Sequence, residues 1–210
     1  MARYIGPVCR LCRREGEKLF LKGEKCAKNS CPVSKRPTAP GQHGTSRKKL
    51  SEYGQMLREK QKTKRIYGVL EGQFRKYFKI ADNTPGITGE NLLRQLEIRL
   101  DNVVFRMGLG RSRTEARQVV RHNLITVNGK KVNIPSYQVR VGDVIQVRDN
   151  ARSLDRFKEI LAVTDRRAVP EWLTADYEQL KGVINAIPTR DQIATDVRET
   201  LIVEFYSNRL

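Results

Sequence analysis

The residues best suited to chemistry in this sequence are its four cysteines, which all lie within the first 31 positions. Cys9 and Cys12 are separated by two residues, and Cys26 and Cys31 by four. Two such pairs can supply four thiolates to one tetrahedral zinc ion, although the second pair is wider than the usual two-residue spacing. Four thiolates leave no coordination position for water. The pattern therefore predicts one structural zinc ion and not a catalytic one.

The competing interpretation of the cysteines is a pair of disulfides. No secretory apolar region follows Met1, and no apolar run approaches the roughly 18 residues of a membrane helix, so we expect a cytoplasmic protein without membrane contact. A reducing cytosol disfavours disulfides and favours zinc. His43, in a turn-rich linker, could replace a metal ligand or contact a phosphate or base, but an ordinary loop histidine is the default.

Other catalytic patterns are not visible in the sequence. It shows no paired carboxylates, no Cys/His dyad, no phosphate-binding glycine loop and no dinucleotide fingerprint. Both histidines, His43 and His122, stand among basic residues without an evident partner. We therefore predict that the chain is not an enzyme.

The charge of the chain indicates a polyanionic partner. The 41 lysines and arginines exceed the 23 acidic residues, giving a net charge of +18. Residues 1–65 carry a net charge of +13, residues 66–165 +6 and residues 166–210 −1. A nucleic acid would therefore contact the N-terminal and central parts of the chain.

One stretch, residues 112–147, combines cations with a recognisable local structure. Ser112 and Glu115 have the spacing of a helix capping box. Asn128-Gly129 has the composition of a tight hairpin turn, and Gly142-Asp143 suggests a second strand pair. The basic residues that we expect to face RNA in this stretch are Arg113, Arg117 and Arg121, which fall within about 80° on the helix, together with Lys130 and Lys131 on the hairpin. A solvated basic face is the alternative interpretation.

Two further groups of cations are candidate RNA contacts. The first surrounds the cysteines and comprises Arg3, Arg10, Arg13 and Arg14. The second lies on and before a helix predicted from Ser51 to about Ile66 and comprises Arg47, Lys48, Lys49, Arg58, Lys62 and Arg65. A helix that carries so many positive charges repels itself in water and is stabilised by a polyanion.

Apolar periodicity predicts the architecture around these sites. We expect an α+β protein with a zinc-bound N-terminal segment (1–45), a mostly helical domain (46–98, completed by 165–210) and a small α/β RNA-binding module of short helices and antiparallel strands (99–164). The apolar tail 201–206 is strand-like. Trp172 could stack on a base, but a single tryptophan is more often a packing anchor.

The sequence resembles a known family along nearly its whole length. Ser112-Arg113, Asn128-Gly129 and Gly142-Asp143 are similar to the RNA-binding module of bacterial small-subunit ribosomal protein four. The remaining matching segments are Arg3-Tyr4-Ile5-Gly6-Pro7, the four cysteines, Pro40-Gly41-Gln42-His43-Gly44, Leu57 to Lys62, Arg99-Leu100-Asp101-Asn102 and Ile202 to Ser207. The cysteines resemble the zinc-binding version of the family.

The resemblance implies a structural role in the small ribosomal subunit. Family members bind 16S rRNA early, at a five-way junction of the 5′ domain, and nucleate assembly of the subunit body. They lie beside ribosomal protein five, near the channel through which mRNA enters, and contribute to translational accuracy. No homo-oligomer is expected. The alternatives are an RNA-modifying enzyme and a factor that rescues stalled ribosomes, since both can carry the same RNA-binding module.

Overall fold

Two units make up the chain in this computed structural model, which describes residues 3–46, 49–164 and 168–207. The first unit comprises Met1–Leu92 and Thr195–Leu210, and the second comprises Leu93–Ala194. The helices of the first unit and the antiparallel sheet with helices of the second unit confirm the predicted α+β class. No helix in the described ranges is both long and apolar enough to span a membrane.

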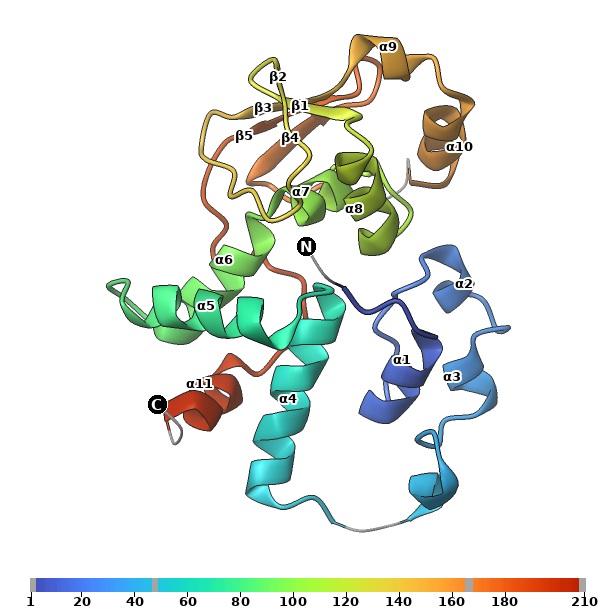
Figure 1. The fold of residues 1–210 in the computed structure, drawn as a ribbon, viewed down its shortest axis with the longest axis vertical. Helices are drawn as coiled ribbons and strands as arrows, with labels where there is room; N and C mark the ends of the chain where they lie inside the picture. The colour runs from blue at the N-terminus through green and yellow to red at the C-terminus, as the bar shows by residue number, and fades with distance from the viewer. Residues whose placement is uncertain (1–2, 47–48, 165–167, 208–210) are drawn as a thin grey trace. The chain divides into compact units, whose positions relative to one another are not determined.

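Helices build the first unit (Figure 1). They are α1 (Cys9–Glu15), α2 (Glu24–Ala27), α3 (Pro32–Lys35), the 3-10 helix η1 (Gln42–Thr45), α4 (Glu52–Ile66), α5 (Glu71–Asp82), the start of α6 (Thr88–Glu97) and α11 (Glu199–Ser207). The Ser51 hydroxyl accepts a hydrogen bond from the Gly54 amide at 3.2 Å, which confirms the predicted cap of α4. On α5, Phe74, Tyr77 and Phe78 recur at helical spacing and are buried as an apolar stripe.

The C-terminal tail is a helix, and the prediction of a strand there was wrong. α11 packs beside α4 in the first unit (Figure 1). Ile202, Phe205 and Tyr206 recur at helical spacing and are all buried, so a helix places them on one face against α4 and α5. The Phe205 ring also stacks on Tyr53 of α4, with 5.7 Å between ring centroids.

Glu71 holds α4, α5 and α11 together. Its carboxylate accepts hydrogen bonds from Lys60 at 2.8 Å, Lys64 at 3.0 Å and the Tyr206 hydroxyl at 2.9 Å. Burial by itself raises the pKa of Glu71, but these three donors outweigh burial and lower the pKa to about 2. Burial, together with the contact to Glu71, raises the pKa of Tyr206. A carboxylate that stays charged in the fold therefore fastens the terminal helix.

Glu71→Gln should lower the free energy of unfolding at pH 7 by about 1 kcal/mol, because 46 % of the Glu71 side chain is exposed and solvent weakens its ion pairs. The folded-state pKa lies below the ordinary value of 4.5. The stabilisation is therefore present above about pH 5 and is lost as the pH falls towards 2. Urea unfolding at pH 7 and near pH 2.5 measures this difference. An equal deficit at both pH values contradicts the assignment, and Glu204→Gln, an exposed carboxylate of α11, is the control.

An antiparallel sheet forms the centre of the second unit, in the order β2-β1-β3-β5-β4. Its strands are β1 (Ile125–Val127), β2 (Lys130–Lys131), β3 (Val144–Val147), β4 (Leu173–Asp176) and β5 (Lys181–Ile184). Its helices are the end of α6, α7 (Leu100–Arg106), α8 (Arg113–Arg121), α9 (Asp149–Arg152) and α10 (Asp155–Thr164). α7 and α8 lie together on one side of the sheet (Figure 1).

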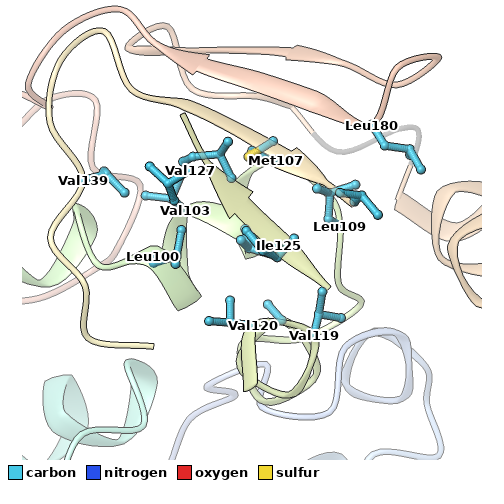
Figure 2. Close-up of a cluster of buried hydrophobic side chains, with 14 of the residues drawn as sticks. Leu100, Val103, Met107, Leu109, Val119, Val120, Ile125, Val127, Val139 and Leu180 are labelled. Atoms are coloured by element: carbon cyan, nitrogen blue, oxygen red, sulfur yellow. The ribbon is translucent and has the colours of Figure 1, made fainter. Parts of the chain in front are cut away.

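The core of this unit lies between the sheet and α7 and α8. Figure 2 shows Val119 and Val120 on the side of α8 that faces Ile125 of β1. Val103 of α7 and Met107, which directly follows α7, belong to the same buried cluster. Trp172 is only 1 % exposed within this cluster, so it is a packing anchor.

Two parts of the second unit differ from the prediction. Val139 does not pair across Gly142-Asp143 with β3, because its amide donates to Ile98 before α7 at 3.0 Å. β3 pairs instead with β1 and with β5, including the partners Val144 and Val183. The predicted return of residues 165–210 to the helical domain therefore applies only from Thr195, because residues 173–184 complete the sheet and satisfy the open edge of β3.

Candidate nucleic-acid interface

The capping box at the start of α8 is present in a modified form. The Ser112 hydroxyl accepts a hydrogen bond from the Glu115 amide at 3.3 Å. The Glu115 carboxylate reaches one residue further back than in the usual motif and accepts from the Arg111 amide at 2.8 Å. These bonds fix the direction in which α8 leaves the preceding loop. They therefore also fix where its arginines point.

Arg117 points into the second unit and is only 5 % exposed. Its Nη1 lies 2.9 Å from Oδ2 of Asp101, and that buried carboxylate also receives Nε and Nη2 of Arg99 at 3.0 and 2.7 Å. Arg117 is about 60° from Val120 around α8, at the edge of the apolar arc, so Asp101 on α7 can draw its long side chain inward. The RNA contact proposed for Arg117 stays a prediction, but its surroundings support an internal ion pair.

Arg113 is half-buried and belongs to a second polar network. Its Nε donates to the side-chain oxygen of Asn102 at 2.8 Å, and its guanidinium lies 4.6 Å from the centroid of the Phe105 ring. Asn102 in turn donates to the carboxylate of Glu97 at 2.7 Å. That buried carboxylate also receives Nε and Nη2 of Arg106 at 3.0 and 2.7 Å. The guanidinium of Arg113 is thus held in one orientation before any ligand arrives.

The hairpin cations are exposed and rigidly supported. Asn128 and Gly129 have φ values of 50° and 76°, which confirms the predicted turn with two left-handed residues. The Asn128 side chain accepts from the Val144 amide and donates to Asp143, both at 2.8 Å. These bonds tie the turn to the start of β3. Lys130 and Lys131 are therefore presented to solvent on a braced edge strand. Arg121, at the end of α8, is also exposed.

Lysines on an edge strand also have a purely structural use, because they discourage pairing with another sheet. A cation at the end of a helix likewise interacts favourably with the helix dipole. Lys130, Lys131 and Arg121 are each compatible with these roles. Their exposure makes them available to a ligand as well, which distinguishes them from Arg117.

Three cations predicted on α4 are engaged in ion pairs within the first unit. Arg58 and Arg65 both contact the Glu15 carboxylate, which lies at the end of α1, and the Arg58 distance is 3.3 Å. Burial raises the pKa of Glu15 despite the two opposing guanidinium groups. Lys62 lies 3.0 Å from Glu17. These pairs attach the cysteine segment to α4, and an RNA contact by the same residues stays a prediction.

The cations predicted near the N-terminus are mostly exposed. Arg3, Arg10, Arg14 and Lys49 project into solvent. Nε of Arg13 donates to the carbonyl of Thr38 at 3.0 Å. Arg47 and Lys48 lie outside the described residues. Figure 1 shows α1 to α3 as the blue part of the first unit, and Arg10, Arg13 and Arg14 belong to α1.

α5 carries an exposed basic face that was not predicted from the sequence. Arg75, Lys76 and Lys79 all project into solvent. They occupy the positions between the buried residues of the apolar stripe. The sequence signal for this face is therefore the set of basic residues on the polar side of an amphipathic helix. Arg140, whose amide donates to Asp143 at 2.8 Å beside the hairpin, is another exposed cation that was not predicted.

The cysteine segment has several features of a thiolate site. All four cysteines are free thiols, and Cys12, Cys26 and Cys31 are buried at 4, 6 and 3 % exposure. Burial raises the pKa of the Cys12 thiol, the backbone at Leu19 opposes this change, and the nearby sulfurs of Cys26, Cys9 and Cys31 raise the pKa further. The Lys22 amide also donates to the sulfur of Cys26 at 3.4 Å.

The four cysteine side chains are not arranged as a metal site in the structure. Among the described residues, no group of three or more cysteine, histidine or acidic side chains is placed so that it could hold a metal ion. The residue types, their burial and the amide donors to sulfur fit zinc, but the ligand geometry does not. The predicted zinc ion therefore stays a prediction.

Comparisons with known proteins identify the family. The model of the ribosomal protein S4/S9 N-terminal domain matches residues 3–97, and that of the S4 domain matches residues 98–145. The small ribosomal subunit protein uS4 of Heliobacterium modesticaldum is 61 % identical over 207 residues, covering 99 % of this chain and all of that protein. The uS4 proteins of Pelotomaculum thermopropionicum and Acidithiobacillus ferrooxidans are 60 and 59 % identical over the same length.

The chain belongs to the ribosomal protein S4 family. This family consists of structural ribosomal proteins and not of enzymes, which confirms the two corresponding predictions from the sequence. The S4 domain match contains α7, α8 and the hairpin, and it ends within β3. The strands β4 and β5, which complete the sheet of the second unit, thus come from the chain beyond that match.

Proposed function

We propose that this protein is a structural constituent of the small ribosomal subunit, is located there in the cytoplasm and binds 16S rRNA. The observation that carries the proposal is identity of about 60 % with uS4 proteins along their entire length. The net charge of +18 and the exposed cations of both units support an RNA ligand. Arginine and lysine release counterions condensed on phosphates, so binding should weaken steeply with salt.

The proposed interface uses the exposed cations of each unit. In the second unit these are Arg121, Lys130, Lys131 and Arg140, and Arg113 adds a pre-oriented guanidinium. In the first unit they are Arg3, Arg10, Arg14 and Lys49, with Arg75, Lys76 and Lys79 on α5. RNA helices offer phosphates and shape more readily than base edges in a deep major groove, so binding would follow the folded backbone of the rRNA.

We further propose the specific role that the family resemblance implies. The protein binds early at the five-way junction of the 5′ domain and nucleates assembly of the subunit body. It contacts ribosomal protein five, lies near the channel through which mRNA enters, and contributes to translational accuracy. It acts as one copy and not as a homo-oligomer. Two RNA-binding units on one chain support a role in assembly, because two linked contacts bind folded RNA more tightly than either alone.

We also propose one structural zinc ion held by Cys9, Cys12, Cys26 and Cys31. When bound, zinc would be coordinated by the four thiolates and would stabilise the folded segment, without a catalytic role. Three of the sulfurs are already buried, and backbone amides donate to two of them. The segment contains few apolar residues, so it needs such a point to be ordered.

Lys130→Gln together with Lys131→Gln should weaken binding to a transcript of the 16S rRNA 5′ domain by about tenfold at moderate salt. Loss of two phosphate contacts should also flatten the dependence of log K on log salt by roughly 1.4 to 1.8. Filter binding across a salt series measures both quantities. Arg152→Gln with Lys158→Gln removes the same charge from the same unit, where each cation has a nearby acidic partner. Equal weakening by the control pair would contradict a specific hairpin contact.

A further inference from the structure

Phe20 has a backbone conformation that aromatic residues rarely adopt. Its φ value is +50°, in the left-handed region, and 55 % of its surface is exposed. For a residue with a Cβ atom this conformation costs about 1–2 kcal/mol, whereas glycine and asparagine adopt it more easily. An exposed phenylalanine also gives up the stabilisation of burial. Both costs fall on the same residue, which suggests that the ring serves to bind a partner.

The residues around Phe20 explain how the ring comes to face solvent. Leu19, immediately before it, is only 4 % exposed, and the backbone at Leu19 contacts the sulfur of Cys12. The Lys22 amide donates to the sulfur of Cys26, and the Gly23 amide donates to the Phe20 carbonyl at 3.4 Å. The backbone is thus fixed on both sides of Phe20. The left-handed turn between these anchors projects the ring outward from a rigid support.

Three lysines and one glutamate, Glu24, follow this ring within eight positions along the chain. Lys22, Lys25 and Lys28 are all exposed within eight positions of Phe20. An aromatic face beside flexible ammonium groups suits a single-stranded nucleic acid, whose base stacks on the ring while its phosphates meet the cations. An apolar protein surface would offer no counter-charge to the three exposed lysines that follow Phe20 in the chain. The charge therefore favours RNA as the partner.

We propose that the Phe20 ring stacks on an unpaired base of rRNA, with Lys22 and Lys25 neutralising phosphates of the same strand. The inference rests on the proposed function and adds a base contact to an interface otherwise made of phosphate contacts. Stacking needs an aromatic face and no particular base, so it positions an unpaired nucleotide without reading its identity.

Three variants of the full-length chain test the proposal with a transcript of the 16S rRNA 5′ domain. Phe20→Leu removes the aromatic face and should weaken binding about tenfold, equal to about 1.4 kcal/mol, with an unchanged salt slope. Phe20→Asn relieves the left-handed conformation, so it should raise or preserve the melting temperature while losing the same affinity. Phe20→Trp should bind as tightly as the wild type.

Phe20→Trp also gives a direct signal. The introduced indole should be quenched when the transcript is added, whereas wild-type fluorescence should stay constant, because Trp172 is buried and is the only native tryptophan. If the wild type binds and all three variants bind equally well without quenching, base stacking by Phe20 is excluded. If the wild type does not bind the transcript at all, the proposed function fails, and this inference fails with it.

Discussion

Asp101→Asn should lower the free energy of unfolding of the second unit by about 3–5 kcal/mol, because it removes the negative charge between two buried guanidinium groups. Asp101 is 4 % exposed, and Arg99 and Arg117 are 1 and 5 % exposed. The asparagine amide fills a similar volume but no longer supplies the negative charge that both guanidinium groups contact at low local dielectric. Urea unfolding followed by the fluorescence of Trp172, which lies in the core of the same unit, measures the loss.

Asp149→Asn is the matched control for this prediction. Its carboxylate also pairs with an arginine, Arg152 at 3.0 Å, but 86 % of the Asp149 side chain is exposed. An exposed pair contributes at most about 1 kcal/mol, so this variant should unfold almost as the wild type does. If Asp101→Asn lowered the free energy of unfolding as little as the control does, the buried position of Arg117 would not depend on its ion pair with Asp101. The role of Arg117 as an RNA contact would then regain support.

Removal of the proposed zinc ion should unfold the cysteine segment, with a local loss of about 10 kcal/mol or more at neutral pH. Its helices α2 and α3 each contain only four residues, so without the ion its stability would rest on a few buried side chains and on its ion pairs with α4. Elemental analysis should find one zinc per chain. After chelation, hydrogen exchange should accelerate in residues 3–45, while the sheet of the second unit keeps its protection as an internal control.

The zinc prediction has a clear opposite outcome. A metal-free protein whose cysteine segment still exchanges slowly would show that the ion pairs of Glu15 with Arg58 and Arg65 suffice to order it. Cys26→Ser offers a second approach, because it removes one ligand without a chelator. It should reproduce the accelerated exchange if the sulfur binds zinc.

Features that depend on neighbouring residues in the chain could be predicted from the sequence. The cap at Ser51, the start of α8 at Ser112 and the Asn128-Gly129 turn follow from local hydrogen bonding and backbone preference, and the structure contains all three. The apolar stripe of α5 could be predicted for the same reason, because its helical period alone indicates a buried face.

Features that depend on residues far apart in the sequence could not be predicted from it. Arg117 and Arg121 occupy similar angular positions on α8, and only the placement of Asp101 on α7 separates a buried side chain from an exposed one. Likewise, Arg58 is recognisable as basic, but its pairing with Glu15 spans 43 positions. The pairing of β3 with β5 and the helical tail also depend on tertiary contacts, which override local propensity.

The retention of the protein on washed small ribosomal subunits tests the central claim most directly. Subunits from the cells that make this protein would be sedimented through increasing salt, and the protein would be quantified against 16S rRNA. A structural constituent should remain at one copy per subunit after a high-salt wash, because multiple contacts within folded rRNA dissociate slowly. An RNA-modifying enzyme or a rescue factor would be substoichiometric and would leave in the wash, and that result would contradict the account.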